Sequence, residues 1–429
     1  MSTTLVLKGG DVVDQAGRRR ADVVVVDGMI AAVGPDLDAP TGAQVLDAAG
    51  CLVSPGLVDL HTHLREPGKE EAETVETGSR AAALGGFTAV LAMPNTTPAI
   101  DSAAMVREVI ELGRRASLCD VYVSGAITVG RGGERLAPLA EMAALGVRFF
   151  TDDGNGVQDT RLMRRALEYA SGLGVTLAQH CEDDALCAGG VMHEGEWSSR
   201  LGLAGQPSEA EELMVLRDLA LSRLTGARVH FQHLSTRRSV ALVREARAAG
   251  LPVSCEATPH HFTLTHAECA SYDPVFKVNP PLRTDADVAA VKVGLGDGTI
   301  DAIATDHAPH APHTKELPFD QAPPGMLGLE TALALALTEL TLPVEEVLAL
   351  LSWRPAMVGG MAERHGGPVT PGRAANLAVV DPAHEWVVDP NALASKARNT
   401  PYAGRRLRGR VRHTVFGGVA VVVDAEAQR

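Results

Sequence analysis

Residues 57–68 read LVDLHTHLREPG, an apolar β-type run that ends in His61, His63 and Arg65 at every second position. Alternate side chains of a strand point to the same face, so these three groups would share one edge of a strand end. Two imidazoles placed together in this way are potential metal ligands. The run is also the first of eight similar segments, and their order along the chain predicts the fold.

The other seven segments are also rich in apolar and β-branched residues, and they read FTAVLAMPN, DVYVSGAIT, VRFFTDD, VTLAQHCE, RVHFQHLS, PVSCEATPH and IDAIATDH. Helical stretches such as TVETGSRAAALGG and TRLMRRALEYASGLG lie between them. This α/β alternation predicts a (β/α)8 TIM-like barrel, whose active-site groups lie at the C-terminal strand ends. A doubly wound open sheet is the competing layout, but no glycine-rich nucleotide-binding motif follows a strand to support it.

Both ends of the chain consist of short, glycine-punctuated β-type runs, such as TLVLKGG near the start and RVRHTVFGGVAVVVDA near the end. We therefore expect a small β-sandwich domain formed by the N- and C-terminal segments together. The predicted division assigns residues 1–54 and 366–429 to this domain and residues 55–365 to the barrel.

The composition argues against several classes of protein. A net charge of −14, a pI near 5.5 and the lack of a basic block argue against nucleic-acid and anionic-membrane binding. The sequence shows neither an apolar run long enough for a membrane span nor a signal-peptide pattern. Its six cysteines are scattered without a CxxC pair, so we expect reduced thiols in a cytoplasmic protein.

Polar side chains follow the strand segments at equivalent places. Any one of them alone would be interpreted as a structural histidine or a turn aspartate. Burying so many without partners would be costly, so metal coordination explains the set best. The residues concerned are His61, His63, Asn95, Asp152 or Asp153, His180, His233 and Asp306, with His307 and His310 soon after.

Four imidazoles and two carboxylates without thiolates favour Zn²⁺, with Mn²⁺, Co²⁺ or Fe²⁺ as alternatives. Six ligands are too many for one catalytic ion with an open position, and they suit two ions about 3.5–4 Å apart. Such a pair would share a bridging group and a bridging hydroxide, and would lower the pKa of that water toward about 7. The sequence therefore predicts a metal-dependent hydrolase.

Together the motifs resemble dihydroorotases, and more narrowly the bacterial class I enzymes of the amidohydrolase superfamily. The resemblance covers nearly the whole chain, in the order VDLHTHLREPG, GGFTAVLAMPNTTP, FFTDDG, LAQHCED, FQHLST, PHH, FKVNPPLR, IATDHAPH, GLET and TPGRAANLAVVDP. It implies a cytoplasmic cyclic amidohydrolase that interconverts L-dihydroorotate and N-carbamoyl-L-aspartate in pyrimidine biosynthesis.

The resemblance also implies two Zn²⁺ ions per chain, although spacing alone leaves the choice between Asp152 and Asp153 open. The implied ligands are His61, His63 and Asp306 for the more buried ion, His180 and His233 for the other, and Asp153 as the bridge.

Roles in the reaction follow from the same resemblance and from charge. The bridging hydroxide would attack the ring carbonyl, with Asp306 as the general acid/base that carries its proton to the leaving nitrogen. Arg65 would hold the substrate carboxylate, because a guanidinium binds a carboxylate bidentately. Residues 311–328 form a long, proline-rich connection that we expect to be a substrate loop. The further implied substrate-binding residues are Asn95, Asn279, His310, Pro324 and Gly325.

Hydantoinases and allantoinases are the nearest alternative, and many of them bridge their metals with a carboxylated lysine. This chain has six lysines, and none lies between residues 70 and 276, so a lysine bridge near residue 150 is impossible. A non-catalytic scaffold for aspartate carbamoyltransferase is the other alternative, but such a form should have lost ligands that this chain retains. The resemblance implies a homo-oligomer, expected to be a dimer, and allows a complex with that transferase.

Overall fold

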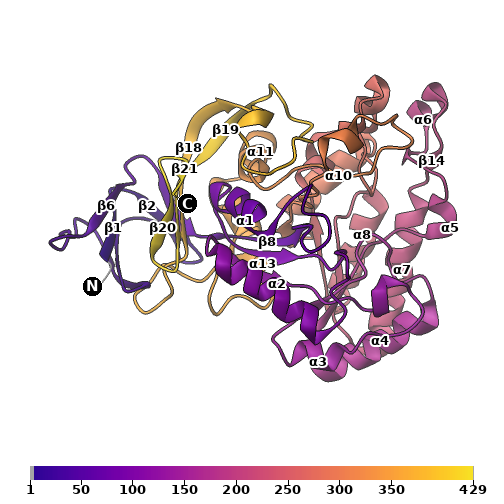
Figure 1. The fold of residues 1–429 in the computed structure, drawn as a ribbon, viewed down its shortest axis with the longest axis horizontal. Coiled ribbons are helices and arrows are strands. Elements are labelled where there is room, and N and C mark those ends of the chain that lie inside the picture. Colours follow the sequence, from indigo (N-terminus) through magenta and orange to yellow (C-terminus); the bar gives the residue numbers. More distant parts are fainter. Residues whose placement is uncertain (1–3, 429) are drawn as a thin grey trace.

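Eight parallel strands form the predicted barrel, in the part of the chain coloured from purple to orange in Figure 1. The structure is a computed structural model that describes residues 4–428. Pairing runs in two series, β10-β9-β8 and β11-β12-β15-β16-β17, and parallel bridges from Gly125 to Phe150 and from Thr62 to His307 join the two series. The strands are β8 (Leu57–Thr62), β9 (Phe87–Ala92), β10 (Asp120–Val123), β11 (Phe149–Phe150), β12 (Thr176–Gln179), β15 (Val229–Phe231), β16 (Val253–Ala257) and β17 (Ala302–Ile303).

Helices alternate with these strands and cover the outside of the barrel (Figure 1). Local signals fix their ends: the Asp159 side chain accepts a hydrogen bond from Leu162 N at the start of α4, and Gly174 ends that helix with a left-handed φ of 67°. The helices are α1 (Val75–Leu84), α2 (Ala103–Ala116), α3 (Leu139–Ala143), α4 (Thr160–Leu173), α7 (Glu209–Thr225), α8 (Arg237–Ala248), α10 (Asp285–Gly296), α11 (Ala332–Glu339), α12 (Val344–Leu351) and α13 (Trp353–Val358).

Short elements interrupt the connections between barrel strands and helices. They include α5 (Asp184–Cys187), β13 (Met192–His193), α6 (Glu196–Leu201), β14 (Gly205–Gln206), α9 (Pro259–Thr263) and the 3-10 turns η1 (Val129–Arg131), η2 (His266–Ser271), η3 (Pro274–Phe276) and η4 (Pro312–Lys315). Most of them follow the C-terminal ends of strands, where the predicted site residues also lie.

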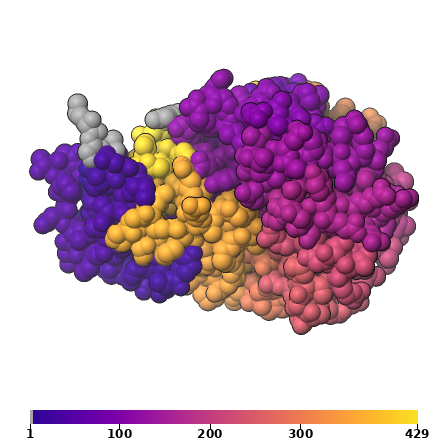
Figure 2. Space-filling view, turned by 90° about the horizontal axis from the view of Figure 1, so that it is seen from below, coloured from indigo at the N-terminus to yellow at the C-terminus, as the bar shows by residue number. Residues whose placement is uncertain are grey.

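The two ends of the chain build the small β domain together, as predicted. Figure 2 shows the indigo N-terminal segment and the yellow-orange C-terminal segment side by side at one end of the molecule. A four-stranded sheet, β5-β4-β1-β6, and a seven-stranded sheet, β21-β20-β19-β18-β7-β2-β3, share one apolar core. The strands are β1 (Thr4–Lys8), β2 (Asp11–Asp14), β3 (Gly17–Arg20), β4 (Asp22–Val26), β5 (Met29–Gly34), β6 (Gln44–Asp47), β7 (Leu52–Pro55), β18 (Leu377–Val387), β19 (Arg406–Phe416), β20 (Val419–Val423) and β21 (Glu426–Ala427), with the turn η5 (Pro390–Ala392) between β18 and β19.

The domain boundaries at residues 54/55 and 365/366 are kept as a proposal; the first lies one residue before the end of β7, and the second lies between α13 and β18. Residues 1–3 and 429 of the predicted small domain lie outside the described residues. All six cysteines are free thiols, as expected. Among residues 4–428, every helix is too short or too polar to cross a bilayer.

The barrel interior is packed with apolar side chains below the strand ends that carry the predicted ligands. Leu60, Leu91, Phe149 and Ala302 belong to one buried apolar cluster contributed by different strands. All six residues of β9, FTAVLA, are buried, as expected for a parallel strand covered on both faces. Polar residues that follow these strands therefore lie directly above an apolar core.

Candidate active site

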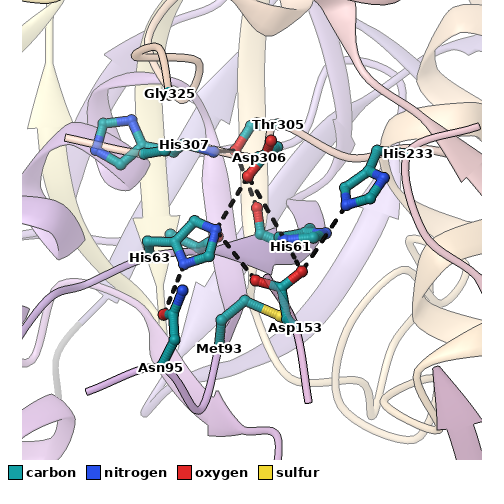
Figure 3. A network of polar contacts seen from close by, with 12 residues as sticks. His61, His63, Met93, Asn95, Asp153, His233, Thr305, Asp306, His307 and Gly325 are labelled. Carbon is teal, nitrogen blue, oxygen red and sulfur yellow. Dashed lines mark hydrogen bonds and ion pairs between the residues drawn. The ribbon is translucent and has the colours of Figure 1, made fainter. Parts of the chain in front are cut away.

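The six predicted metal ligands come from the ends of five barrel strands and meet on one face of the barrel. Figure 3 labels five of them: His61, His63, Asp153, His233 and Asp306. His61 is the second-last residue of β8. Each of the other five ligands lies within three residues of the end of a strand. All six side chains are buried: His61, His63, Asp153, His180, His233 and Asp306.

The two histidines of the β8 end have the same hydrogen-bonding pattern. His61 Nδ1 lies 2.9 Å from Glu256 Oε1, and His63 Nδ1 lies 2.8 Å from Asn95 Oδ1. With each Nδ1 beside an oxygen that accepts its hydrogen, each Nε2 points into the site, where a metal ion could take the place of a proton. The two Nε2 atoms face the same carboxylates, at 3.5 Å and 3.0 Å from Asp306 Oδ1.

Asp153 lies between the two groups of histidines. Its Oδ1 is 3.2 Å from His61 Nε2, 3.6 Å from His180 Nδ1 and 3.8 Å from His233 Nε2, while its Oδ2 is 3.5 Å from His63 Nε2. One carboxylate thus contacts histidines from three further strands. This is the arrangement expected of a bridging ligand.

His180 and His233 form the second histidine group. His180 Nε2 lies 2.8 Å from Glu182 Oε2, which turns its Nδ1 toward His233 Nε2 at 2.9 Å. Two facing imidazole nitrogens need either a proton or a cation between them. The Glu182 contact orients His180 in the same way that Glu256 orients His61.

The donor set fits one or more metal ions. Ligand atoms of His61, Asp153 and His233 lie within 4.8 Å of one another, and so do those of His61, His63 and Asp306. His61 Nε2 and Asp153 Oδ1 are buried without a hydrogen-bond partner, which is costly unless another group satisfies them. Imidazoles and carboxylates without thiolates suit a divalent ion such as zinc.

The neighbouring Asp152 points away from the histidines. Its Oδ1 accepts hydrogen bonds from the backbone N–H groups of Ile127 and Thr128, at 2.9 and 3.0 Å. This carboxylate therefore ties the loop after β10 to the loop after β11. The spacing of the sequence could not distinguish the two aspartates, whereas the directions of their side chains do.

The charges of the site are strongly coupled. Burial opposes ionisation of Asp306, but the adjacent imidazoles of His61 and His63 outweigh it and hold the pKa of this carboxyl below its usual range. Burial likewise works against the positive charge of His61, whose pKa is nevertheless raised by Asp153 and Asp306. Asp306 is thus ionised, which is the form in which a carboxylate binds a metal ion.

The predicted substrate residues surround a cavity of about 160 Å³ above the ligands. Arg65 is 7% exposed and its Nε donates to the Pro309 carbonyl at 3.0 Å, which leaves its other nitrogens available. Burial lowers the pKa of Arg65 to about 10, so the guanidinium remains charged at neutral pH. The cavity is lined by His63, Arg65, Asn95, Asp153, Gly154, His180, His233, Val278, Asn279, Asp306, Ala308, His310, Pro324 and Gly325.

The 311–328 connection folds against this cavity. His310 Nε2 donates to the Pro324 carbonyl at 2.8 Å, and Gly325 N donates to the Lys277 carbonyl at 2.8 Å. Lys315 Nζ also donates to the Pro323 carbonyl at 2.7 Å, and these contacts hold Pro324 and Gly325 at the cavity wall. Two larger hollows, of about 740 and 590 Å³, share Arg148 and Gly359 near the opposite ends of the strands and contain none of the predicted site residues.

Sequence reasoning missed the carboxylates behind the ligands. Glu256 is fully buried in β16 and contacts both His61 and, through Oε2 at 3.1 Å, His230. A single carboxylate inside the apolar run PVSCEATPH was the available signal, because an isolated buried charge needs a partner. Glu182, two residues after His180, was visible in LAQHCED but had no assigned role.

Known proteins match the chain along its whole length. The sequence model of the family described as Dihydro-orotase-like matches residues 50–239. The dihydroorotase of Pelotomaculum thermopropionicum is 50% identical over 98% of this chain and 99% of its own length. That of Anaeromyxobacter dehalogenans is 50% identical over 100% of both chains, and that of Streptomyces coelicolor 48% identical over 99% of this chain and 100% of its own.

Solved structures share the fold. The L-hydantoinase (dihydropyrimidinase) of Arthrobacter aurescens superimposes with a TM-score of 0.89 and 25% identity, over 100% of this chain and 98% of its own. A D-hydantoinase superimposes with a TM-score of 0.86 and 23% identity, over 99% of this chain and 96% of its own. These structures confirm the barrel with its β-sandwich domain. At about half identity over the full chain to named relatives, the protein belongs to the dihydroorotase family.

Proposed function

We propose that the protein is an active dihydroorotase, which interconverts L-dihydroorotate and N-carbamoyl-L-aspartate in pyrimidine biosynthesis. The observation that carries the proposal is the position of Arg65 beside the histidine and carboxylate cluster. A metal-ligand set alone suits many hydrolases, whereas a buried, charged guanidinium at the same cavity selects a substrate that carries a carboxylate. The small cavity, about 160 Å³, suits a single small ring compound.

The metal assignment is part of this proposal. His61, His63 and Asp306 would hold one Zn²⁺ ion, and His180 and His233 a second, with Asp153 between the two. When bound, such ions would lower the pKa of a water molecule to about 7 and would polarise the amide carbonyl. Aspartate in the bridging position, where lysine is impossible, supports this family over the lysine-bridged hydantoinases and allantoinases.

The residues of the chain then divide the reaction between them. Arg65, with Asn95 and His310 nearby, holds the exocyclic carboxylate, and Asn279 and the backbone of Pro324 and Gly325 contact the ring. Asp306 takes the proton of the attacking water and delivers it to the ring nitrogen as the carbon–nitrogen bond breaks. The single ring-opened product carries a ureido NH₂ group and a new carboxyl group, which loses the second proton of the water to solvent, and in the cyclisation direction both proton movements are reversed.

Oligomer formation is proposed as well, as a homodimer that can also bind aspartate carbamoyltransferase. Apolar side chains exposed on the outer face of α7 support an interface, since Leu213 and Leu216 are each 51% exposed and Leu224 is 60% exposed. Light scattering of the purified protein, alone and mixed with the transferase, tests both contacts. A monomer that does not associate with the transferase would contradict them.

An assay of four compounds tests the function itself. Purified, zinc-loaded protein should cyclise N-carbamoyl-L-aspartate and hydrolyse dihydroorotate, and it should leave hydantoin and allantoin unchanged. All four compounds are assayed both with and without aspartate carbamoyltransferase. Arg65→Lys should retain the bound metal but raise KM by about tenfold or more, because lysine cannot bind a carboxylate bidentately. Turnover of hydantoin or allantoin without turnover of dihydroorotate would overturn the proposal.

A further inference from the structure

Arg131 lies beside the candidate site, and none of the roles described above involves it. It ends the η1 turn in the loop after β10 and has a φ of 57°, in the left-handed region that bulky residues rarely adopt. Three residues already assigned to the site share this backbone feature: Arg65 (φ 63°), His233 (φ 32°) and Asp306 (φ 44°). Backbone strain of this kind is concentrated at functional sites.

Two observations, one at the backbone of Arg131 and one at its guanidinium, place this residue beside the cavity. Asn155 Nδ2 donates to the Arg131 carbonyl at 2.8 Å, which joins its loop to the loop that carries Asp153. A Cβ placed on Gly154 would lie 4.0 Å from Arg131 Nη2 and 3.9 Å from Asn95 Nδ2. Gly154 and Asn95 both line the cavity, and the absence of a side chain at Gly154 leaves open the space between them and Arg131.

This guanidinium has no partner of its own. Among residues 4–428 its nitrogens make no hydrogen bond or ion pair, and its Nε is buried and unsatisfied. Asp152 and Asp153 face it from the neighbouring loop without forming an ion pair. Its positive charge contributes, after burial, to lowering the pKa of Arg65 and of Lys69, so Arg131 adds positive charge beside the cavity that Arg65 lines. An unpaired, partly buried cation is less stable than a paired one, and an anion from outside would pair with it.

We propose that Arg131 is a second anion-binding residue of this site, which favours the dianionic open-chain substrate over the monoanionic ring. The inference rests on the proposed function. N-Carbamoyl-L-aspartate carries two carboxylates and dihydroorotate one, and Arg65 accounts for the carboxylate that the two compounds share. A fixed cation attracts a ligand in proportion to the ligand's charge, so Arg131 strengthens binding of the dianion more than binding of the monoanion.

A purely structural role makes a different prediction. If Arg131 only balanced the charges of Asp152 and Asp153, its removal would weaken metal retention or stability and would affect both substrates alike. The anion-binding role and the structural role therefore predict different ratios of affinity for the two substrates. This ratio has to be measured on protein that contains its metal.

The test compares Arg131→Gln with the charge-retaining Arg131→Lys and with Arg135→Gln, a control that removes an exposed arginine from the same loop. A substitution cannot change the equilibrium constant of the reaction, so it must lower kcat/KM by the same factor in both directions. A preference of Arg131 for one of the two substrates therefore has to be measured as a difference between their KM values. For Arg131→Gln we expect KM to rise about tenfold for N-carbamoyl-L-aspartate and about threefold for dihydroorotate. Arg131→Lys should recover most of the loss, and Arg135→Gln should leave both values within about twofold of the wild type.

Salt provides a second readout, because screening should reduce the difference in KM between wild type and Arg131→Gln. Arg131→Asn supplies the same charge change if the glutamine variant does not fold, since asparagine adopts a left-handed φ more readily.

An equal rise of both KM values, or loss of metal from the folded variant, would overturn the inference. Failure of the wild type to process either compound would instead overturn the proposed function, so the two failures are distinguishable.

Discussion

Glu256 gives the most direct test of how the site is assembled. It is fully buried in β16, its Oε1 lies 2.9 Å from His61 Nδ1, and its Oε2 lies 3.1 Å from His230 Nε2. Burial alone would raise the pKa of this carboxyl, but the hydrogen bonds from His230 and His61 outweigh it and lower the pKa to about 2. The carboxylate is therefore ionised, and it fixes the hydrogen of His61 on Nδ1 so that Nε2 faces the site.

Glu256→Gln keeps the size and one acceptor oxygen but removes the charge. A hydrogen bond to a charged group contributes about 1.5–3 kcal/mol and a neutral one about 0.5–1.5 kcal/mol, so the His61 contact should weaken by about 1.5 kcal/mol. That difference corresponds to about tenfold in an equilibrium constant. We expect metal affinity to fall by about tenfold to a hundredfold, in line with the effect of other groups that orient a metal-binding histidine.

Competition with a chromophoric chelator measures the affinity, and a thermal melt of the metal-free protein measures the fold. Asp14→Asn is a matched control, because Asp14 is a buried, ion-paired carboxylate of the small β domain, 2.9 Å from Arg19 and remote from the ligands. The control should lower the melting temperature and leave metal affinity unchanged. Unchanged metal affinity in a folded Glu256→Gln protein would refute the reasoning that Glu256 orients His61.

Three further predictions concern other parts of the molecule. Asp306→Asn should lower kcat by about a thousandfold while the fold persists, and a rate near that of the wild type would exclude Asp306 as the proton carrier. Lys315→Met should raise KM by about threefold to tenfold, because Lys315 Nζ holds the carbonyls of Pro274 and Pro323 beside the cavity, and an unaltered KM would show that the loop is held by other contacts. Burial raises the pKa of Glu330 from 4.5 to about 7, so its contribution to stability is present below pH 4.5 and is lost as the pH rises through 7. Glu330→Gln should therefore melt near the wild-type temperature at pH 5 and above it at pH 8, and equal melting temperatures at both pH values would contradict this.

Most of the fold could be predicted because the repeating unit leaves a strong local pattern. Each of the eight apolar runs contains a barrel strand, and the stretches TVETGSRAAALGG and TRLMRRALEYASGLG contain α1 and α4. The short elements from α5 to β14 were not predicted. Segments of two to six residues carry too little periodicity, and tertiary contacts rather than local preference keep them in place.

The candidate site was predictable in its composition but not in its contacts. The order of motifs identified the ligand residues, because strand ends of a parallel barrel meet on one face. The partner of His61 could not be identified, since Glu256 lies 195 residues further along the chain and its strand resembles any other apolar run. Arg131 was also missed, because a lone arginine in a glycine-rich loop is ordinarily a solvated surface residue.

The interleaved small domain has a consequence for how the protein is made. β7 pairs with β2 on one side and with β18 on the other, and every barrel strand lies between β7 and β18 in the sequence. A ribosome therefore releases β1 to β7 well before β18 to β21 exist, and during translation of the barrel the apolar edge of β7 has no partner. The barrel strands are thus synthesised while they are tethered to this unfinished sheet, which is completed only when the later segment that carries β18 pairs with β7.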